Sequence, residues 1–309
     1  MKKLNNKATV LICSCDNYSD IWYPFFKLLQ TYWSDCPFRI ILNTESKIYP
    51  EKRVECPQLY KHMSHNEIKK ICYGKRMLDH LSLIDSEYVI LLLDDFFLKG
   101  PVNTKEILRL LEQMDYDKTI ASINTDISYD SADNLTLLQG YRLKPNYSDY
   151  KLDLQAGIWR KDVLLKYWLP YMSPWDFECY GSILTINDGY KYYQRDYHTP
   201  PIFYYYDPQN FFEFGLRNGK WYKNSVETLF RENNINVDFS IRGTINNDTD
   251  KTANKIKLLF NAFSFKKIYQ VFRIIGIRWS CFWIYWKILF LLNRTNREFL
   301  WWYRENIKQ

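Results

Sequence analysis

The sequence predicts an open α/β sheet flanked by helices, and two observations support this prediction. Short, mostly apolar runs of strand length recur along the first half of the chain, at 8–15, 39–43, 88–93 and 119–124, as expected of parallel strands covered on both faces. Segments with helical spacing of apolar residues separate these runs, and such alternation is typical of a Rossmann-like sheet. With 309 residues, 47% of them hydrophobic, the chain is long enough for one such domain with an appendage.

Helices are expected between these strands. The segments 21–32 and 66–83 carry apolar residues at roughly helical spacing. Asn103 is a plausible N-cap for a further helix at 104–114.

Polar residues follow three of the predicted strands: Cys15-Asp16-Asn17, Asn43-Thr44 and Asp94-Asp95. In open α/β sheets, ligands bind at the carboxyl ends of the strands. The two adjacent Asp after the apolar run Tyr88–Leu93 would place charges at the rim of a core, where they need a cation or hydrogen-bond donors. Mg²⁺ or Mn²⁺ bridging a diphosphate would meet that need. Alternatively, one Asp caps the following turn and the other is solvated.

Three segments, in this order, resemble the nucleotide-binding half of GT-A glycosyltransferases: Val10–Asp16, Gly74-Lys75-Arg76 and Leu91–Phe96. The resemblance covers about residues 8–205 and implies a GT-A open mixed sheet that binds a nucleoside diphosphate sugar. In that family a strand ends in an acidic metal-binding motif, usually written DxD. This chain has Leu93-Asp94-Asp95 instead, which puts strict metal dependence in question.

The resemblance implies a role for each of these polar residues. Asp95 would be the main ligand of Mn²⁺ or Mg²⁺, with Asp94 directed to the ribose or to a metal-bound water. Asp16 would recognise the base or the ribose. Lys75 and Arg76 would lie near the nucleotide, although a solvated helix charge is an equal alternative for Lys75.

Two segments of the second half resemble the same family. Gln155–Trp159 resembles the loop near the donor sugar, where Gly157 would let the backbone approach the ligand closely. Ser173–Glu178 resembles the acceptor-side acidic segment at a helix start, with Ser173 as N-cap and Pro174 in the first helical position.

The second of these segments supplies the candidate general base. Trp175 could stack on the acceptor sugar, and either Asp176 or Glu178 could deprotonate its hydroxyl. Two residues apart on a helix, these carboxylates point about 200° from each other, so one of them serves. Glu178 is favoured, because Asp176 lies early enough to interact with the helix dipole; an acidic first turn without a catalytic role is the alternative. His198, further downstream, resembles the family's metal-binding histidine, or is structural.

The positive charge of the chain belongs to its tail. Residues 255–309 hold eleven Lys and Arg against two Glu, a net charge of +9 in a chain whose total is +7. Within the apolar, aromatic stretch Ile274–Leu292, the longest uncharged run, Trp279–Trp286, is far shorter than the roughly 20 residues that span a bilayer. A helical, basic and aromatic tail lying on an anionic membrane surface is therefore expected, with a docked helix or a dimer contact as alternatives. Nucleic acid is a disfavoured partner, because no recognition motif accompanies the charge.

The expected organisation is a GT-A-like catalytic domain at 1–250 followed by the tail at 251–309. Its nucleotide-binding part would cover about 8–125 and its acceptor part about 126–250. Seven scattered cysteines indicate a reducing compartment, and the apolar run after Met1–Lys7 is too short for a signal peptide. The expected location is the cytoplasm, at the inner face of the cell membrane.

The predicted function is transfer of a sugar from a nucleoside diphosphate sugar to a saccharide or lipid-linked saccharide acceptor. The resemblance implies bacterial surface polysaccharide assembly as its context. Two alternatives remain open. A sugar-phosphate nucleotidyltransferase would normally carry a glycine-rich phosphate loop after the first strand, where this chain has Ser14–Asn17. A non-catalytic, membrane-associated glycan-binding or scaffold protein would tolerate replacement of Asp95.

Overall fold

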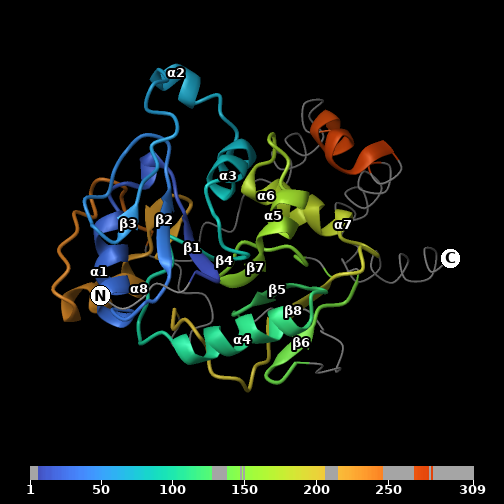
Figure 1. Ribbon diagram of the computed structural model, residues 1–309. Coiled ribbons are helices and arrows are strands. Elements are labelled where there is room, and N and C mark those ends of the chain that lie inside the picture. Colours follow the sequence, from blue (N-terminus) through green and yellow to red (C-terminus); the bar gives the residue numbers. More distant parts are fainter. Residues whose placement is uncertain are drawn as a thin grey trace, which may run out of the picture.

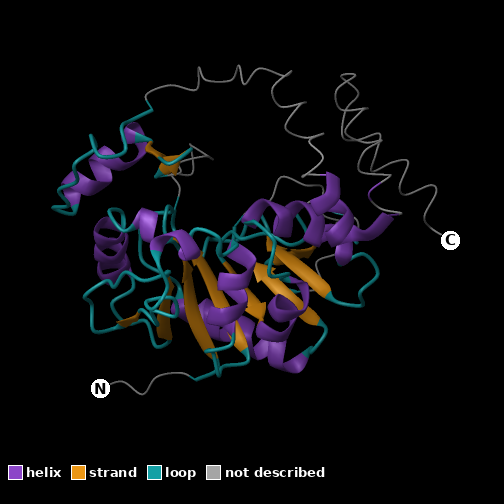
Figure 2. Cartoon of the chain, turned by 90° about the horizontal axis from the view of Figure 1, so that it is seen from above, coloured by secondary structure: helices purple, strands orange, loops and turns teal. Residues whose placement is uncertain are grey.

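An eight-stranded mixed sheet with helices on both faces forms the centre of the computed structural model (Figures 1 and 2). The structure describes residues 6–126, 138–146, 148, 150–205, 215–245, 268–277 and 280. The sheet strands are β1 (Ala8–Cys13), β2 (Arg39–Asn43), β3 (Val54–Glu55), β4 (Tyr88–Leu93), β5 (Ile120–Asn124), β6 (Tyr141–Leu143), β7 (Gly157–Arg160) and β8 (Lys191–Arg195). The α-helices are α1 (Trp22–Tyr32), α2 (His65–Ile68), α3 (Tyr73–Leu81), α4 (Thr104–Tyr116), α5 (Lys161–Tyr167), α6 (Pro174–Asp176), α7 (Ser182–Leu184) and α8 (Lys223–Glu232).

Strand order and direction place the ends of the main strands along one edge. The order is β3-β2-β1-β4-β7-β5-β8-β6. Neighbouring pairs among β3, β2, β1 and β4 are parallel, as are β5 and β8, whereas β7 is antiparallel to both β4 and β5. The predicted open mixed α/β sheet is therefore confirmed. Because β7 is reversed, its first residue lies toward the carboxyl ends of its two neighbours.

Side-chain alternation along the central strands builds two cores. In β1, Val10 and Ile12 face the core that α1 and α4 cover, whereas Leu11 and Cys13 face the core that α3 and α5 cover. This alternation follows from the two-residue period of a strand. Both faces are apolar, which explains why the strand sequences are nearly continuous apolar runs.

Most of the helices predicted in the first half are confirmed, and one is wrong. Asn103 caps α4 as expected, since its side chain accepts the Glu106 N–H at 3.1 Å. The single helix predicted at 66–83 is instead divided into α2 and α3. Ser64 starts α2 through a capping box with Glu67, and Cys72 then adopts an extended conformation before α3 begins.

Packing explains where α3 starts. The backbone N–H groups of Gly74 and Lys75 donate to the carbonyls of Met172 and Pro170, at 2.8 and 3.0 Å. A Cβ atom on Gly74 would lie 2.1 Å from the carbonyl oxygen of Leu169, so this close approach requires glycine. The break in the predicted helix therefore has a tertiary cause that helical spacing does not reveal.

The remaining described segments pack against this framework. A short antiparallel pair, β9 (Leu216–Arg217) and β10 (Lys220–Trp221), precedes α8. A helix at 268–277, red in Figure 1, buries Val271, Ile274 and Ile275 in the core shared with α3 and α5. Within the described ranges, no helix has both the length and the apolar character needed to cross a bilayer. Most of the predicted membrane-binding tail lies outside the described residues.

Candidate active site

The acidic pair lies where β4 ends. Asp94 is buried, and its carboxylate accepts a hydrogen bond from the Ser14 hydroxyl, which follows β1. The Ser14 oxygen in turn accepts the indole N–H of Trp22 at 2.7 Å. Burial, followed by the nearby charge of Asp95, holds the pKa of Asp94 well above its usual range.

Asp95 is half-buried beside it. Burial raises the pKa of this carboxyl to about 6. Its backbone carbonyl accepts the Gly215 N–H at 3.1 Å, which ties the strand end to the segment before β9. Two adjacent acids with raised pKa values form a site where a cation would be strongly stabilised.

The residues present fit a divalent cation. Carboxylate oxygens suit Mg²⁺ or Mn²⁺, and Mg²⁺ is commonly held by one or two carboxylates together with substrate phosphates. Asp94 and Asp95 offer such a pair at the ligand-binding edge of the sheet. No third His, Cys, Asp or Glu completes a protein-only metal cluster among the residues that the structure describes. Further ligands would therefore come from the substrate or from water.

Two arginines bring positive charge to the same edge. Arg76 of α3 is buried, donates to the Ser14 carbonyl at 3.0 Å and forms an ion pair with Glu45. Arg242 forms two hydrogen bonds with Asp20, at 2.5 and 2.6 Å, and its guanidinium lies 4.5 Å from the ring centroid of Tyr18.

Arg242 also interacts electrostatically with Asp94. Its positive charge acts to lower the pKa of Asp94 and is thus a long-range partner of that carboxylate. Nothing in the sequence around Arg242 marks it as a site residue, because its link to the first strand spans more than two hundred positions. The excess of carboxylates at this edge is the signal that could have prompted a search for a distant arginine.

Asp16, predicted to recognise the base or the ribose, orders a neighbouring loop. Its carboxylate accepts the backbone N–H groups of Glu45, Ser46 and Lys47, with distances of 3.1 to 3.2 Å. The Ser46 hydroxyl adds a fourth donor at 2.6 Å. Asp16 therefore joins the end of β1 to the loop after β2, at the edge where the acidic pair lies.

Lys75 and Arg76 are adjacent in sequence but face different surroundings. Arg76 is buried against the end of β1, whereas Lys75 is exposed and forms an ion pair with Asp79 one helical turn away. Successive helical residues point about 100° apart, and in this structure the two cations have separate partners. Of the two, Arg76 is the one that reaches the candidate site.

Gly157 occupies the predicted position near the strand ends. As the first residue of β7, it pairs with Leu91 of β4 and with Asn124 of β5. A Cβ atom at this position would lie 3.3 Å from the carbonyl oxygen of Ile123, which is tighter than usual. The residues just before Gly157 therefore run next to the end of β4.

The structure distinguishes Asp176 from Glu178. Ser173 caps α6 and Pro174 occupies its first turn, as predicted. Asp176 is fully buried and accepts hydrogen bonds from the Ser173 N–H at 2.9 Å and the Ser173 hydroxyl at 2.6 Å, so it holds the start of the helix. Trp175, by contrast, is 70% exposed and could contact an acceptor sugar.

Glu178 is half-buried and has a different environment from Asp176. It lies in a wide π-type turn, Phe177–Gly181, and its carboxylate accepts the Leu154 N–H at 3.0 Å. Burial raises its pKa to about 7; the charge of Asp153 adds to this shift, and the Leu154 N–H opposes it. Because Leu154 lies three residues before Gly157, this contact places Glu178 on the side of the sheet where β4 ends.

His198 does not join the acidic pair. It is exposed in the turn after β8, where its N–H donates to the Asp196 carboxylate at 2.9 Å. No metal-binding group of three side chains includes it within the described ranges. The structure therefore separates His198 from Asp94 and Asp95, and its predicted metal role gains no support here.

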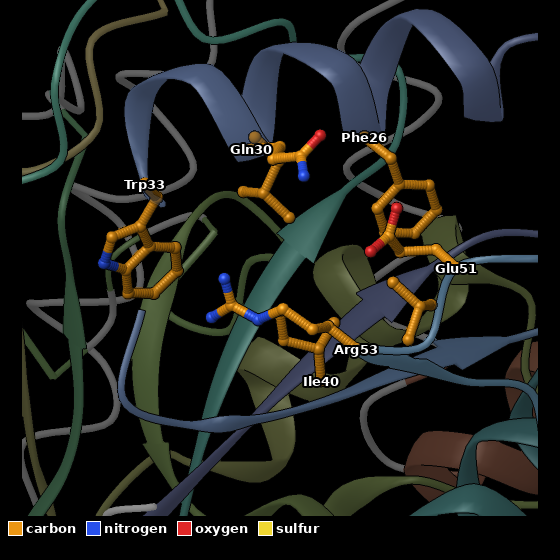
Figure 3. Close-up of a pocket in the computed structure, with 8 residues that line it drawn as sticks. Phe26, Gln30, Trp33, Ile40, Glu51 and Arg53 are labelled. Atoms are coloured by element: carbon orange, nitrogen blue, oxygen red, sulfur yellow. The ribbon is translucent and has the colours of Figure 1, made fainter. Parts of the chain in front are cut away.

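A small cavity lies apart from these residues, beneath α1 (Figure 3). Its lining residues include Phe26 of α1, Trp33 directly after that helix, Ile40 of β2 and Arg53, and its volume is about 30 Å³. The Arg53 guanidinium donates hydrogen bonds to the carbonyl oxygens of Ser34 and Cys36, each at 2.9 Å. This cavity contains none of the predicted site residues and is too small for a sugar nucleotide.

Comparisons with known proteins give a limited picture. No family model matches the chain, and no curated protein matches it. Among solved structures, residues 1–349 of S. aureus TarS are 13% identical, with 87% of this chain and 81% of that chain covered and a TM-score of 0.45. A longer S. aureus TarS structure is 10% identical, with 85% and 45% covered and a TM-score of 0.39. Likeness at this level says nothing about activity, so any functional assignment depends on the site's own geometry.

Because the pKa of Asp95 is raised, replacing its carboxylate with a neutral group should stabilise the folded protein, and the size of this effect should depend on pH. The folded protein binds this proton more tightly than the unfolded chain, so stability falls as the pH rises from about 4 through about 6. We expect Asp95→Asn, measured in EDTA, to melt at a higher temperature than the wild type at pH 8, with the difference disappearing near pH 4. Glu112→Gln, at an exposed position of α4, is the control. A melting temperature at pH 8 equal to or below that of the wild type would contradict the assignment.

Proposed function

We propose that this protein is a glycosyltransferase that moves a sugar from a nucleoside diphosphate sugar to a saccharide hydroxyl. One observation carries the proposal. The adjacent carboxylates of buried Asp94 and half-buried Asp95, suited to a cation and its diphosphate, lie at the same side of the sheet as Glu178, a separate carboxylate with a pKa near 7. A leaving group that must be neutralised and a hydroxyl that must be deprotonated require these two kinds of group.

Each residue at this edge of the sheet has its own role in the proposed reaction. The carboxylates of Asp94 and Asp95 would hold Mg²⁺ or Mn²⁺, which when bound neutralises charge on the departing diphosphate. Arg76 and Arg242 raise the local positive potential for an anionic donor. The segment that enters β7 at Gly157 would lie next to the donor sugar, because it runs beside the end of β4.

In the proposed transfer step, one bond forms and one bond breaks. The acceptor oxygen attacks the anomeric carbon of the donor, a new C–O bond forms, and the bond from that carbon to the diphosphate oxygen breaks. Glu178 takes the proton of the acceptor hydroxyl, and the diphosphate leaves with the bonding electrons. A single displacement of this kind inverts the configuration at the anomeric carbon. Trp175 would stack on the acceptor ring from the solvent side.

Nucleotide binding is the first test of this function. We expect one of UDP, GDP, CDP and dTDP to raise the melting temperature when Mn²⁺ is present. At a nucleotide concentration a hundredfold above Kd, binding should stabilise the folded protein by about 2.7 kcal/mol. Asp95→Asn should lose the Mn²⁺-dependent part, because the cation loses a carboxylate ligand, whereas Glu112→Gln should keep it. If no nucleotide stabilises the folded wild type, the glycosyltransferase proposal fails and a scaffold role takes its place.

The pKa of Glu178 predicts the pH profile of the transfer reaction. A general base acts in its ionised form, so the rate should rise with pH and level off above about 7. Glu178→Gln should lower kcat by about 10²- to 10⁴-fold while donor affinity stays close to that of the wild type. Initial rates with the donor selected by the nucleotide screen, measured from pH 5 to 9, check both points. An unchanged profile in Glu178→Gln would rule out this base.

Association with an anionic membrane through the basic tail also remains part of the proposal. A lipid-linked acceptor would account for a basic and aromatic tail next to a sugar-transferring domain. The docked helix changes how this should be tested. Val271, Ile274 and Ile275 are buried, so a deletion of 255–309 would also open the core.

A chain that ends at Ile277 keeps the docked helix. It lacks most of the basic residues of 255–309 that lie outside this helix. We expect this variant to keep the melting temperature of the full chain but no longer to co-sediment with vesicles containing phosphatidylglycerol. Vesicles of phosphatidylcholine alone are the control for charge. Equal sedimentation of the two chains would remove the membrane role.

A further inference from the structure

The helix at 268–277 holds the acceptor-side segment through a part-buried hydrogen bond. The Gln270 side-chain amide donates to the carboxylate of Asp176 at 2.6 Å. Asp176 is fully buried and Gln270 is half-buried, so the accepting end of this bond is shielded from water, and hydrogen bonds to ionisable groups are the stronger kind. The oxygen of Asp176 that Gln270 contacts also accepts the N–H and hydroxyl of Ser173.

A second contact fixes the same segment to the same helix. The Arg273 guanidinium lies 3.8 Å from the ring centroid of Tyr171, and the Tyr171 hydroxyl donates to the Arg273 carbonyl at 3.1 Å. Tyr171 and Asp176 are five residues apart, on either side of the Ser173 cap. The helix at 268–277 therefore contacts both ends of the turn that starts α6.

This turn leads directly into the residue that we propose as the base. Phe177 follows Asp176 and stacks on Trp168, with ring centroids 4.1 Å apart. Glu178 comes next, within the π-type turn at Phe177–Gly181. Turns of this kind interrupt the regular helical hydrogen bonds and occur frequently at functional sites. The turn interrupts the regular hydrogen bonds of an otherwise continuous helical segment from α6 to α7, so contacts from outside this segment help to set the direction of Glu178.

We propose that the helix at 268–277 is a positioning element for Glu178, acting through the Gln270–Asp176 hydrogen bond. The catalytic part of this inference rests on the proposed function. Gln270 touches neither substrate nor cation; it orients the base by fixing the buried carboxylate two residues before it. The helix is thus part of the acceptor site and not only a link to the rest of the tail.

The isosteric change Gln270→Glu tests this contact. It keeps the shape of the side chain but replaces a donor with a carboxylate that repels Asp176 at pH 8. Gln270→Lys restores a donor and should behave like the wild type. Ile277→Gln, at a 74% exposed position of the same helix, is the matched control.

Hydrogen–deuterium exchange gives a readout that needs no substrate. In Gln270→Glu we expect the amides of 173–182 to exchange about tenfold faster or more, because a charge-assisted hydrogen bond is lost, while those of β1 and β4 stay unchanged. With the donor selected by the nucleotide screen, kcat should fall about tenfold and the donor KM should stay within about twofold.

The outcomes separate this inference from the proposed function. Unchanged exchange at 173–182, or faster exchange with an unchanged kcat, would overturn the positioning role even in an active enzyme. If the wild type neither binds a nucleotide nor turns over a donor, the proposed function fails and the catalytic part of the inference fails with it. Exchange at 173–182 would then still show whether Gln270 orders this segment.

Discussion

The structure depends on one constraint, the placement of two carboxylates at the end of a strand that is buried on both faces. Isolated charges in such a place are strongly disfavoured, so they need donors, cations or protons. Each requirement is met in part from a different element. Ser14 donates to Asp94 from the end of β1, and Arg242 contributes positive charge from a segment more than two hundred residues further along the chain. Burial still raises the pKa of both carboxyls, so the protein does not fully compensate their charged forms.

The reversed strand β7 connects this edge with the second half of the chain. If β7 ran parallel to its neighbours, the residues that precede it would lie at the opposite edge, away from the acidic pair. Instead Gly157 enters the sheet beside the end of β4, and Leu154 reaches the Glu178 carboxylate. The direction of one four-residue strand therefore decides whether the segment that contacts Glu178 enters the sheet at the edge where the acidic pair lies.

Local sequence signals predicted much of this arrangement, and non-local contacts explain what they missed. The apolar run before Asp94 and the Ser173 cap could be predicted because each depends on neighbouring residues. The division of the helix predicted at 66–83 could not, because Gly74 adopts its place only against the Leu169 carbonyl. Arg242 was missed for the same reason, since its partners Asp20 and Asn17 lie more than two hundred residues away.

Asp176 and Glu178 show how burial and hydrogen bonding assign different tasks to similar residues. Both are carboxylates in one short segment, and spacing alone says that they diverge. Asp176 is enclosed by donors from Ser173 and Gln270, and such a carboxylate serves best as a fixed anchor. Desolvation of the half-buried Glu178 carboxylate, together with the charge of Asp153, brings its pKa close to neutral, although the Leu154 N–H opposes this shift. A base must both lose and accept its proton near the working pH, so the less stabilised carboxylate is the one suited to catalysis.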